Sequence, residues 1–402
     1  MTLVPEIVHV KLGAQKIGRL AVRDRRILFE YDRSFLDSGI ELSPFKLSLK
    51  PGIHSNADGN FDGLFGLFND SLPDGWGRLL QDRQLRQRGI APEIPTPLDR
   101  LAHVGNHGMG ALCYEPDYSD DLPPSALDLD QLAGESMAVL EGGASDVLAK
   151  LIALNGSSAG ARPKVMATVS DDKERISSAP NILNGSGNPW IIKFPARQDQ
   201  HDIGPIEYAY SLMAKAAGVI MPETHLFSAA EGAGYFGARR FDRRGSERMH
   251  VHTVCGLLHA DHRVPSLDYE GILRAAMHLT KSMSEVETML RLAVFNVLTH
   301  NRDDHSKNFS FLMEPDGSWK AAPAYDLTFS AGPGGEHSTT IMGEGRNPTP
   351  EHLQRLGKKM DIARSDEIIE QVQTAVSRWK NFAREAGVSK ESRDSIGKVI
   401  EA

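Results

Sequence analysis

The sequence predicts an α+β fold in which a β-rich first half is followed by a mostly helical second half. Residues 7–31 alternate apolar and polar side chains, with turn residues between the runs, and this period is typical of half-buried strands. Beyond residue 268 the apolar residues recur instead at helical spacing. The chain has 402 residues, and because single cores rarely exceed about 250–300 residues, we expect two or three lobes.

The first half opens with expected strands at Ile7–Leu12, Lys16–Val22 and Arg26–Tyr31. The segment Asn69–Trp76 has the composition of a loop, and a helical pattern follows it over Arg78–Arg88. A closing strand is expected within Gly108–Glu115. Asp and Pro then dominate Pro116–Pro124, which is therefore the expected linker.

Helices and strands alternate in the middle of the chain, and helices dominate after it. Expected strands are Lys164–Val169 and Asn188–Pro195, the second bounded by prolines, which central strands exclude. The expected helices are Leu129–Leu140, Asp146–Leu154, Pro205–Ala217, Asp268–Leu279, Ser284–Leu298, Pro350–Met360 and Ser365–Ala386. These patterns predict modules at 1–122, 123–241 and 242–402.

Composition excludes several classes of protein. A net charge of −8 argues against bulk electrostatic binding of nucleic acid, although Arg239–Arg244 forms a local basic cluster. No apolar run approaches about 18 residues, and the N-terminus lacks the pattern of a secretory signal. Two cysteines form no disulfide framework. We therefore expect a cytoplasmic protein without a membrane span.

The most informative stretch is Asn301–Asn308, which contains Asp303 and ends at Asn308. A further acid, Asp326, follows after two strand-like runs joined by a turn at Glu314–Ser318. This order of acid, amide and acid is the spacing of protein-kinase active sites, where a base precedes two magnesium ligands. Carboxylate and amide oxygens suit Mg²⁺. The stretch therefore predicts a phosphotransferase with Asp303 as base and with Asn308 and Asp326 as metal ligands.

Other candidates would contact the nucleotide. Lys193 lies in an apolar strand, where a lysine is costly to bury without a partner, and Glu207 on the next helix is a candidate partner. The glycine- and serine-rich loop before Lys164 could present N–H groups to phosphate. His305 and Lys307 lie close to the phosphates in this interpretation, although solvated roles for both stay open.

With these residues in place, the sequence resembles the HipA family of bacterial toxin kinases from type II toxin–antitoxin modules. The resemblance is spread over most of the chain. It rests on Gly18–Leu20, Phe29–Asp32, Asn69–Trp76, Ser157–Ala161, Ile192–Pro195, Arg240–Arg243, Asn301–Phe311 and Pro323–Asp326.

The resemblance implies a two-lobed, protein-kinase-like fold that binds ATP and Mg²⁺ between its lobes. It implies phosphate contacts from Lys193, backbone contacts to adenine from Arg239 and Phe241, and autophosphorylation of Ser157. Combined with the analysis of the residues, the expected nucleotide site is Ser157, Ser158, Ala159, Gly160, Lys164, Lys193, Arg239, Phe241, His305 and Lys307. It also implies phosphorylation of translation-related proteins such as aminoacyl-tRNA synthetases. The implied partner is a helix-turn-helix antitoxin similar to HipB, which binds operator DNA. The sequence names neither the substrate nor the antitoxin.

The chain departs from the family pattern in the phosphate loop and at the hinge. Arg162 and Pro163 stand where better-known members have Gln and Glu, and Arg239 stands where an acid is more usual. The histidine-rich segment His250–His262 is also unexpected.

Three alternatives remain open at this stage. The first is a zinc site made from His252, Cys255, His259 and His262, although the spacing is not a recognised pattern. The second is a metal-dependent nuclease or phosphodiesterase that uses Asp303, Asp304, His305 and Asp326. The third is a non-catalytic co-repressor that partners a DNA-binding antitoxin.

Overall fold

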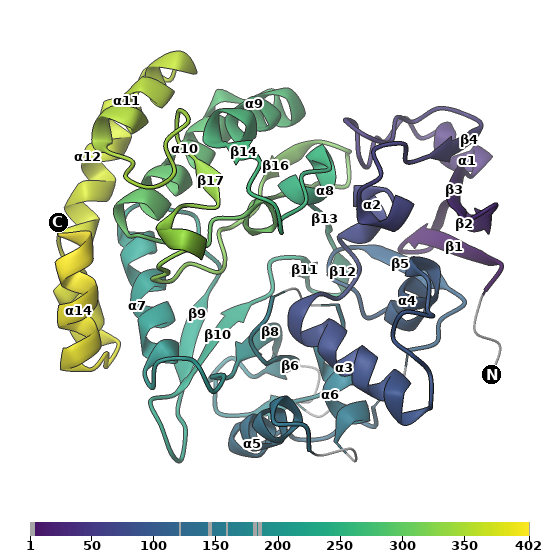
Figure 1. The fold of residues 1–402 in the computed structure, drawn as a ribbon, viewed down its shortest axis with the longest axis horizontal. Helices are drawn as coiled ribbons and strands as arrows, with labels where there is room; N and C mark the ends of the chain where they lie inside the picture. Colours follow the sequence, from purple (N-terminus) through teal and green to yellow (C-terminus); the bar gives the residue numbers. More distant parts are fainter. Residues whose placement is uncertain are drawn as a thin grey trace.

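The computed structural model describes residues 5–119, 122–143, 147–157, 160–179, 183 and 187–401. Its arrangement confirms the expected α+β class: an N-terminal antiparallel sheet, a second sheet in the middle and a largely helical C-terminal part. The N-terminal sheet and the C-terminal helices lie at opposite ends of the molecule (Figure 1).

The N-terminal sheet has the strand order β4-β3-β2-β1-β5. Its strands are β1 (Ile7–Leu12), β2 (Gln15–Arg23), β3 (Arg26–Tyr31), β4 (Ile53–Ser55) and β5 (Leu112–Glu115), and all of its pairs are antiparallel. The helices of this region are α1 (Arg33–Leu36), α2 (Gly66–Asn69), α3 (Gly75–Gln87) and α4 (Pro97–Val104). Alternation explains the strands, since Val8 and Val10 are fully buried while Ile7 and His9 flank them.

The second sheet has the order β7-β6-β8-β10-β9. Its strands are β6 (Lys164–Val169), β7 (Ile176–Ser177), β8 (Asn188–Lys193), β9 (Thr224–Phe227) and β10 (Tyr235–Arg239), and its helices are α5 (Leu129–Leu140), α6 (Leu148–Asn155) and α7 (Ile203–Ala216). The expectation that prolines only bound the second strand was wrong, because Pro189 lies inside β8 opposite Thr168. It is tolerated because it is the second residue of the strand and loses only an N–H donor, while its carbonyl still accepts the Arg240 N–H at 2.8 Å.

The C-terminal part combines helices with a small antiparallel sheet of order β13-β15-β16. Its strands are β13 (His250–Thr253), β15 (Ser310–Met313) and β16 (Trp319–Ala321), with short pairs β11 (Arg243–Arg244) with β12 (Glu247–Arg248) and β14 (Leu267–Asp268) with β17 (Thr339–Thr340). The helices are α8 (Val254–Leu258), α9 (Tyr269–Thr280), α10 (Met283–Leu298), α11 (Pro350–Lys359), α12 (Ser365–Val376), α13 (Trp379–Glu385) and α14 (Lys390–Ile400).

One expected helix, Ser365–Ala386, is divided in the structure into α12 and α13. The break falls at Ser377, whose hydroxyl donates to the Thr374 carbonyl and competes with the helical ladder. The division lets Trp379 pack edge-on against Tyr210 of α7, with ring centroids 5.4 Å apart. Helix α14 follows and was not expected from the sequence.

The two larger of the hydrophobic cores in the described residues join the N-terminal region to the rest. The larger core contains Phe29 and Tyr114 of the first sheet together with Val254, Tyr269 and other residues of the C-terminal helices. The second lies under the middle sheet, and there Trp76 of α3 packs with the residues of β6 and β8. The N-terminal region therefore contributes to both cores.

Candidate functional site

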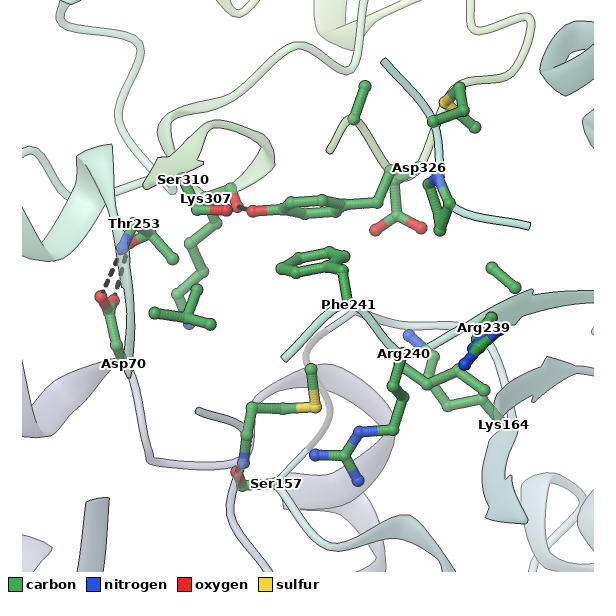
Figure 2. A pocket seen from close by; sticks show the side chains of 18 of the residues that line it. Asp70, Ser157, Lys164, Arg239, Arg240, Phe241, Thr253, Lys307, Ser310 and Asp326 are labelled. Atoms are coloured by element: carbon green, nitrogen blue, oxygen red, sulfur yellow. Dashed lines mark hydrogen bonds between the residues drawn. The ribbon is translucent and has the colours of Figure 1, made fainter. Parts of the chain in front are cut away.

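A cavity of about 150 Å³ lies where the N-terminal region, the middle sheet and the C-terminal hairpin meet. Seven of its lining residues were predicted from the sequence, namely Ser157, Lys164, Lys193, Arg239, Phe241, Lys307 and Asp326. In Figure 2, Asp326 and Lys164 lie toward one end of the pocket, and Asp70 and Thr253 lie toward the other. We call the group of Lys164, Lys193, Glu207 and Asp326 the phosphate end, after the role expected for its lysines.

Lys193, the last residue of β8, makes ion pairs with Glu207 of α7 and with Asp326. The Lys193 and Glu207 side chains are only 15% and 3% exposed, so both charges depend on these contacts. Burial by itself would lower the pKa of Lys193, but Asp326 and Glu207 outweigh it and the pKa is raised. The lysine therefore stays charged, and the expected partnership with Glu207 is present.

Asp326 occupies the left-handed region of the backbone map, with φ 53°. Such a conformation is costly for a residue with a side chain, by about 1–3 kcal/mol, and strain of this kind clusters at functional sites. Burial would raise the pKa of this carboxyl, but Lys193 and Lys164 hold it well below its usual range. Asp326 is therefore an anion at neutral pH, as a metal ligand must be.

The predicted hairpin is present. β15 and β16 pair antiparallel, and the turn is closed by a hydrogen bond from the Glu314 N–H to the Ser318 carbonyl. The Tyr325 hydroxyl donates to the Lys307 carbonyl at 2.6 Å, which ties the return segment to the stretch before β15. This closure ties the segment before Asp326 to the end of Asn301–Asn308. Asp326 lines the cavity, whereas Asp303, His305 and Asn308 lie outside its lining.

Asp303 and Asn308 are joined directly, since the Asn308 amide donates to the Asp303 carbonyl at 2.7 Å. The Asp303 side chain is 57% exposed, with His305 Nε2 3.9 Å from its carboxylate. Partial burial raises the pKa of Asp303, and the charge of Asp326 acts in the same direction while His305 opposes it. Asp303 is thus an accessible carboxylate of raised basicity.

Asp304, the neighbour of Asp303, has a different role. It is fully buried and accepts hydrogen bonds from the Tyr269 hydroxyl (2.8 Å), His337 (2.8 Å) and the Ser338 and Thr339 N–H groups (2.8 and 3.2 Å). These contacts use both carboxylate oxygens. A two-metal site built on Asp304 is therefore contradicted by its position inside the C-terminal core.

The phosphate loop is described at its two ends, while Ser158 and Ala159 lie outside the described residues. Ser157 is 1% exposed, and its hydroxyl accepts the Met109 N–H at 2.9 Å. At the other end, a side chain on Gly160 would come within 2.5 Å of the Lys164 ammonium. The lysine tip could move aside, but Gly160 has φ 101°, a conformation that strongly favours glycine.

Lys164 stands opposite Lys193 in the pairing of β6 with β8, which places two lysines side by side. Burial lowers the pKa of Lys164 to about 8, with Lys193 acting in the same direction and Asp326 opposing it. Arg162 lies nearby, 3.2 Å from Asp199 and 3.6 Å from Glu207. The phosphate end is therefore rich in cations that share a few acids.

The hinge region contains the exposed Arg239 and the partly buried Phe241. Arg239 is exposed, and its N–H donates to the Glu223 carbonyl. Phe241 stacks on Tyr325 with ring centroids 5.7 Å apart and an interplanar angle of 29°. Figure 2 shows Phe241 in the middle of the pocket. In the basic cluster Arg239–Arg244, Arg240 and Arg243 both make ion pairs with the buried Asp242, so these two charges are neutralised within the molecule.

The histidine-rich segment is structural in the described residues. His252 lies 2.6 Å from Asp70 and 2.9 Å from Ser43, one through each ring nitrogen. His259 likewise uses both nitrogens, with the Gly66 N–H and Asp58. The thiol of Cys255 is buried, which raises its pKa to about 12. These contacts argue against zinc, since His252 and His259 are engaged elsewhere and the described residues contain no group of three or more His, Cys, Asp or Glu side chains that could hold a metal ion.

The sequence interpretation missed the acids that the N-terminal region contributes. Asp70 accepts the Thr253 N–H (2.8 Å) and hydroxyl (2.7 Å), and Asp74 lies 2.5 Å from the Lys307 ammonium. Both acids belong to Asn69–Trp76, whose polar residues indicated only a loop. Two Asp residues among Gly and Pro were the available signal, but their partners lie far along the chain.

Comparison with known proteins fits this geometry. A model of the HipA-like C-terminal domain matches residues 156–379, and a model of the HipA N-terminal domain matches residues 8–115. The first covers more than half of the chain. The protein is therefore of the HipA-like kinase class, and the chain belongs to the HipA family.

Individual relatives agree with this assignment. Y4dM of Sinorhizobium fredii, named as a candidate kinase, is 27% identical over 383 residues, which are 90% of this chain and 84% of that protein. Y4mE of the same organism, named likewise, is 27% identical over 342 residues, with shares of 80% and 72%.

A solved structure shows the same fold. The HipA of Shewanella oneidensis, in a complex titled as a toxin–antitoxin system with HipB and operator DNA, superposes with a TM-score of 0.69 at 18% identity. The match covers 98% of this chain and 94% of that one. Separately, every helix in the described part of the chain is too short or too polar to cross a bilayer.

Proposed function

We propose that this chain is an ATP- and Mg²⁺-dependent serine/threonine protein kinase that acts as the toxin of a toxin–antitoxin module. The observation that carries the proposal is the joint ion pairing of Lys193 with Glu207 and Asp326. Kinases need a strand lysine held by a helix glutamate and an acid near the metal, and both must be in place for transfer. Here the three residues meet at one end of the cavity.

The residues of the site fit Mg²⁺. Asp326 is held as an anion, and the Asn308 amide nitrogen is engaged with the Asp303 carbonyl, which orients the amide oxygen away from it. Mg²⁺ usually takes one or two such protein oxygens and completes its shell with water and substrate phosphates. Bound there, the ion would neutralise charge on the transferring phosphoryl group.

The remaining steps belong to the chain's own side chains. Asp303, exposed and of raised pKa, would accept the proton of a substrate hydroxyl as that oxygen attacks the γ-phosphoryl group. Lys193 and Lys164 would hold phosphate oxygens, since both ammonium groups line the cavity. Arg239 and Phe241 would border the adenine. The ends of the cleft thereby orient the nucleotide while Asp303 stays open to a protein substrate.

Self-inactivation and partners extend the same proposal. Ser157 would be autophosphorylated, and since it is buried against Met109 it must first leave its present position. The partner would be a helix-turn-helix antitoxin, as suggested by the HipA and HipB complex that shares this fold. The substrate class would be a translation-related protein such as an aminoacyl-tRNA synthetase, and this part rests on family resemblance.

Transfer of label from γ-labelled ATP to protein tests the kinase assignment. We expect labelled serine or threonine in the presence of Mg²⁺, on Ser157 when no other protein is added. No transfer by the wild-type chain, together with metal-dependent cleavage of DNA, would refute it. Full toxicity in cells of Asp303→Ala would instead favour the co-repressor role.

A further inference from the structure

Asp74 joins three parts of the molecule that are distant in sequence. It directly precedes helix α3, yet its side chain makes no cap contact with that helix. One carboxylate oxygen accepts the Gly160 N–H of the phosphate loop at 2.6 Å, and the other lies 2.5 Å from the Lys307 ammonium. The N-terminal region thus binds the loop and the catalytic stretch with one side chain.

The backbone around Asp74 reinforces the contact with the loop. The Trp76 N–H donates to the Gly160 carbonyl at 3.0 Å, so residues 74–76 hold Gly160 by both its N–H and its carbonyl. Gly75 adopts φ 43°, and a side chain at this position would come within 2.5 Å of the Gly160 carbonyl. The approach of the two segments is therefore as close as glycine allows.

The charges at this contact depend on one another. Lys307 is 8% exposed, and a buried ammonium is costly without a partner. Asp74 supplies that partner, with His262 also nearby at 4.0 Å. Burial would raise the pKa of Asp74, but Lys307 and the Gly160 N–H lower it below its usual range. Asp74 is therefore charged, and it fixes the direction in which Lys307 points.

We propose that Asp74 is a positioning residue for phosphoryl transfer, which sets Lys307 and the phosphate loop at a fixed separation around the nucleotide. This inference rests on the proposed function, since Lys307 and the loop are its expected phosphate contacts. Positioning acts on the geometry of the reacting groups, so its loss lowers kcat more than it raises KM. The N-terminal region is then part of the catalytic apparatus.

Two substitutions separate the contacts of Asp74. In Asp74→Asn the side-chain oxygen can still accept from Gly160, but the charge facing Lys307 is lost. In Asp74→Ala both contacts are lost. We expect kcat to fall at least about tenfold in Asp74→Asn with KM for ATP changed less than about threefold. Asp74→Glu restores the charge and should recover part of kcat.

A matched control is Asp82→Asn on the same helix, whose carboxylate binds Arg78 and Arg100 and not the loop. It should retain wild-type kcat. A double variant of Asp74→Asn with Lys307→Gln should be no slower than Lys307→Gln alone, because the two residues act as a unit. The proposal would be overturned by a wild-type kcat in Asp74→Asn or by additive losses of kcat in the double variant. A raised kcat/KM in Asp74→Asn would also overturn it, because Asp74 would then compete with phosphate for Lys307.

Hydrogen exchange gives a readout that needs no activity. The amide of Gly160 should exchange at least about tenfold faster in Asp74→Ala than in the wild type, and near the wild-type rate in Asp74→Asn. If the Gly160 amide of Asp74→Ala exchanges at the wild-type rate, Asp74 does not hold the loop and the proposal is overturned, whatever the kinase activity of the variant. Conversely, a wild-type chain that transfers no phosphate refutes the proposed function, while exchange still decides whether Asp74 holds the loop.

Discussion

At the phosphate end of the cavity, Lys164 and Lys193 share the charges of Glu207 and Asp326, whereas at the other end each charge has its own hydrogen bonds. Asp70 there accepts both the N–H and the hydroxyl of Thr253. Shared charges can be rearranged when phosphate and a cation arrive, because several groups adjust together. Locally satisfied charges resist such change. The first end is thus suited to chemistry, and the second to holding the walls in place.

The largest expected effect separates chemistry from binding. Asp303→Asn should lower kcat by about 10²–10⁴-fold while leaving KM for ATP nearly unchanged, since Asp303 would act on the hydroxyl proton and not on the nucleotide. Steady-state phosphorylation kinetics measure this. Asp304→Asn is the matched neighbour, and it should lower the melting temperature instead because Asp304 lies in the core. Equal kinetic losses in both variants would mean that the two acids do not differ in role.

A smaller effect is expected at the shared charges. In the described residues, Glu207→Gln leaves Lys193 with Asp326 as its remaining ion-pair partner, so the ammonium should move toward Asp326. We expect kcat/KM for ATP to fall roughly tenfold, which corresponds to about 1.4 kcal/mol. Lys173, whose ion pair with Glu223 lies outside the cavity, offers Lys173→Gln as a control. An unchanged kcat/KM in Glu207→Gln would show that this pair is only structural.

The pH dependence of nucleotide binding sharpens the comparison further. The pKa of Lys164 is lowered to about 8, and bound phosphate would favour its charged form. Above pH 8, binding must therefore take up a proton on Lys164. The affinity for Mg-ATP should then fall by up to about tenfold for each further pH unit, and it should not change with pH below about pH 7. Calorimetry with Mg-ATP across this range measures it. Lys164→Met should bind more weakly at pH 7 and lose the dependence; a wild-type affinity that is constant to pH 9 would contradict the assignment.

The smallest effect on activity is expected at the far end. Asp70→Asn replaces an acceptor with an amide that faces the Thr253 N–H, and should cost roughly 1–3 kcal/mol of stability. Thermal denaturation should show a lower melting temperature, while kcat of the folded fraction stays within about twofold. A large loss of kcat without loss of stability would remove the distinction between the two ends.

Much of the phosphate end could be predicted from the sequence because its signals are local. The hairpin between Asn308 and Asp326 follows from alternation around a turn, and Lys193 stands out as a charge in an apolar strand. Roles that depend on burial could not be predicted. Asp303 and Asp304 are alike in sequence, and only the packing of His337 and Tyr269 around Asp304 separates them.

The contact between Asp74 and Lys307 could not be predicted from the sequence for a different reason. The two residues are separated by 233 positions, and no periodic pattern links a loop acid to a cation so far away. The division of α12 from α13 was missed because the apolar spacing continues across Ser377, although its hydroxyl ends the ladder. Long-range partners and local breaks of this kind require coordinates.

The burial of Ser157 means that its hydroxyl can be reached only when the loop opens. Its hydroxyl is engaged with the Met109 N–H, so a kinase that modifies this serine must wait for the loop to open. The interval between synthesis and silencing would then be set by the frequency of opening and not by the speed of phosphoryl transfer. The delay before self-inactivation would then be a property of the fold, and residues that contact the loop near Met109 would determine its length.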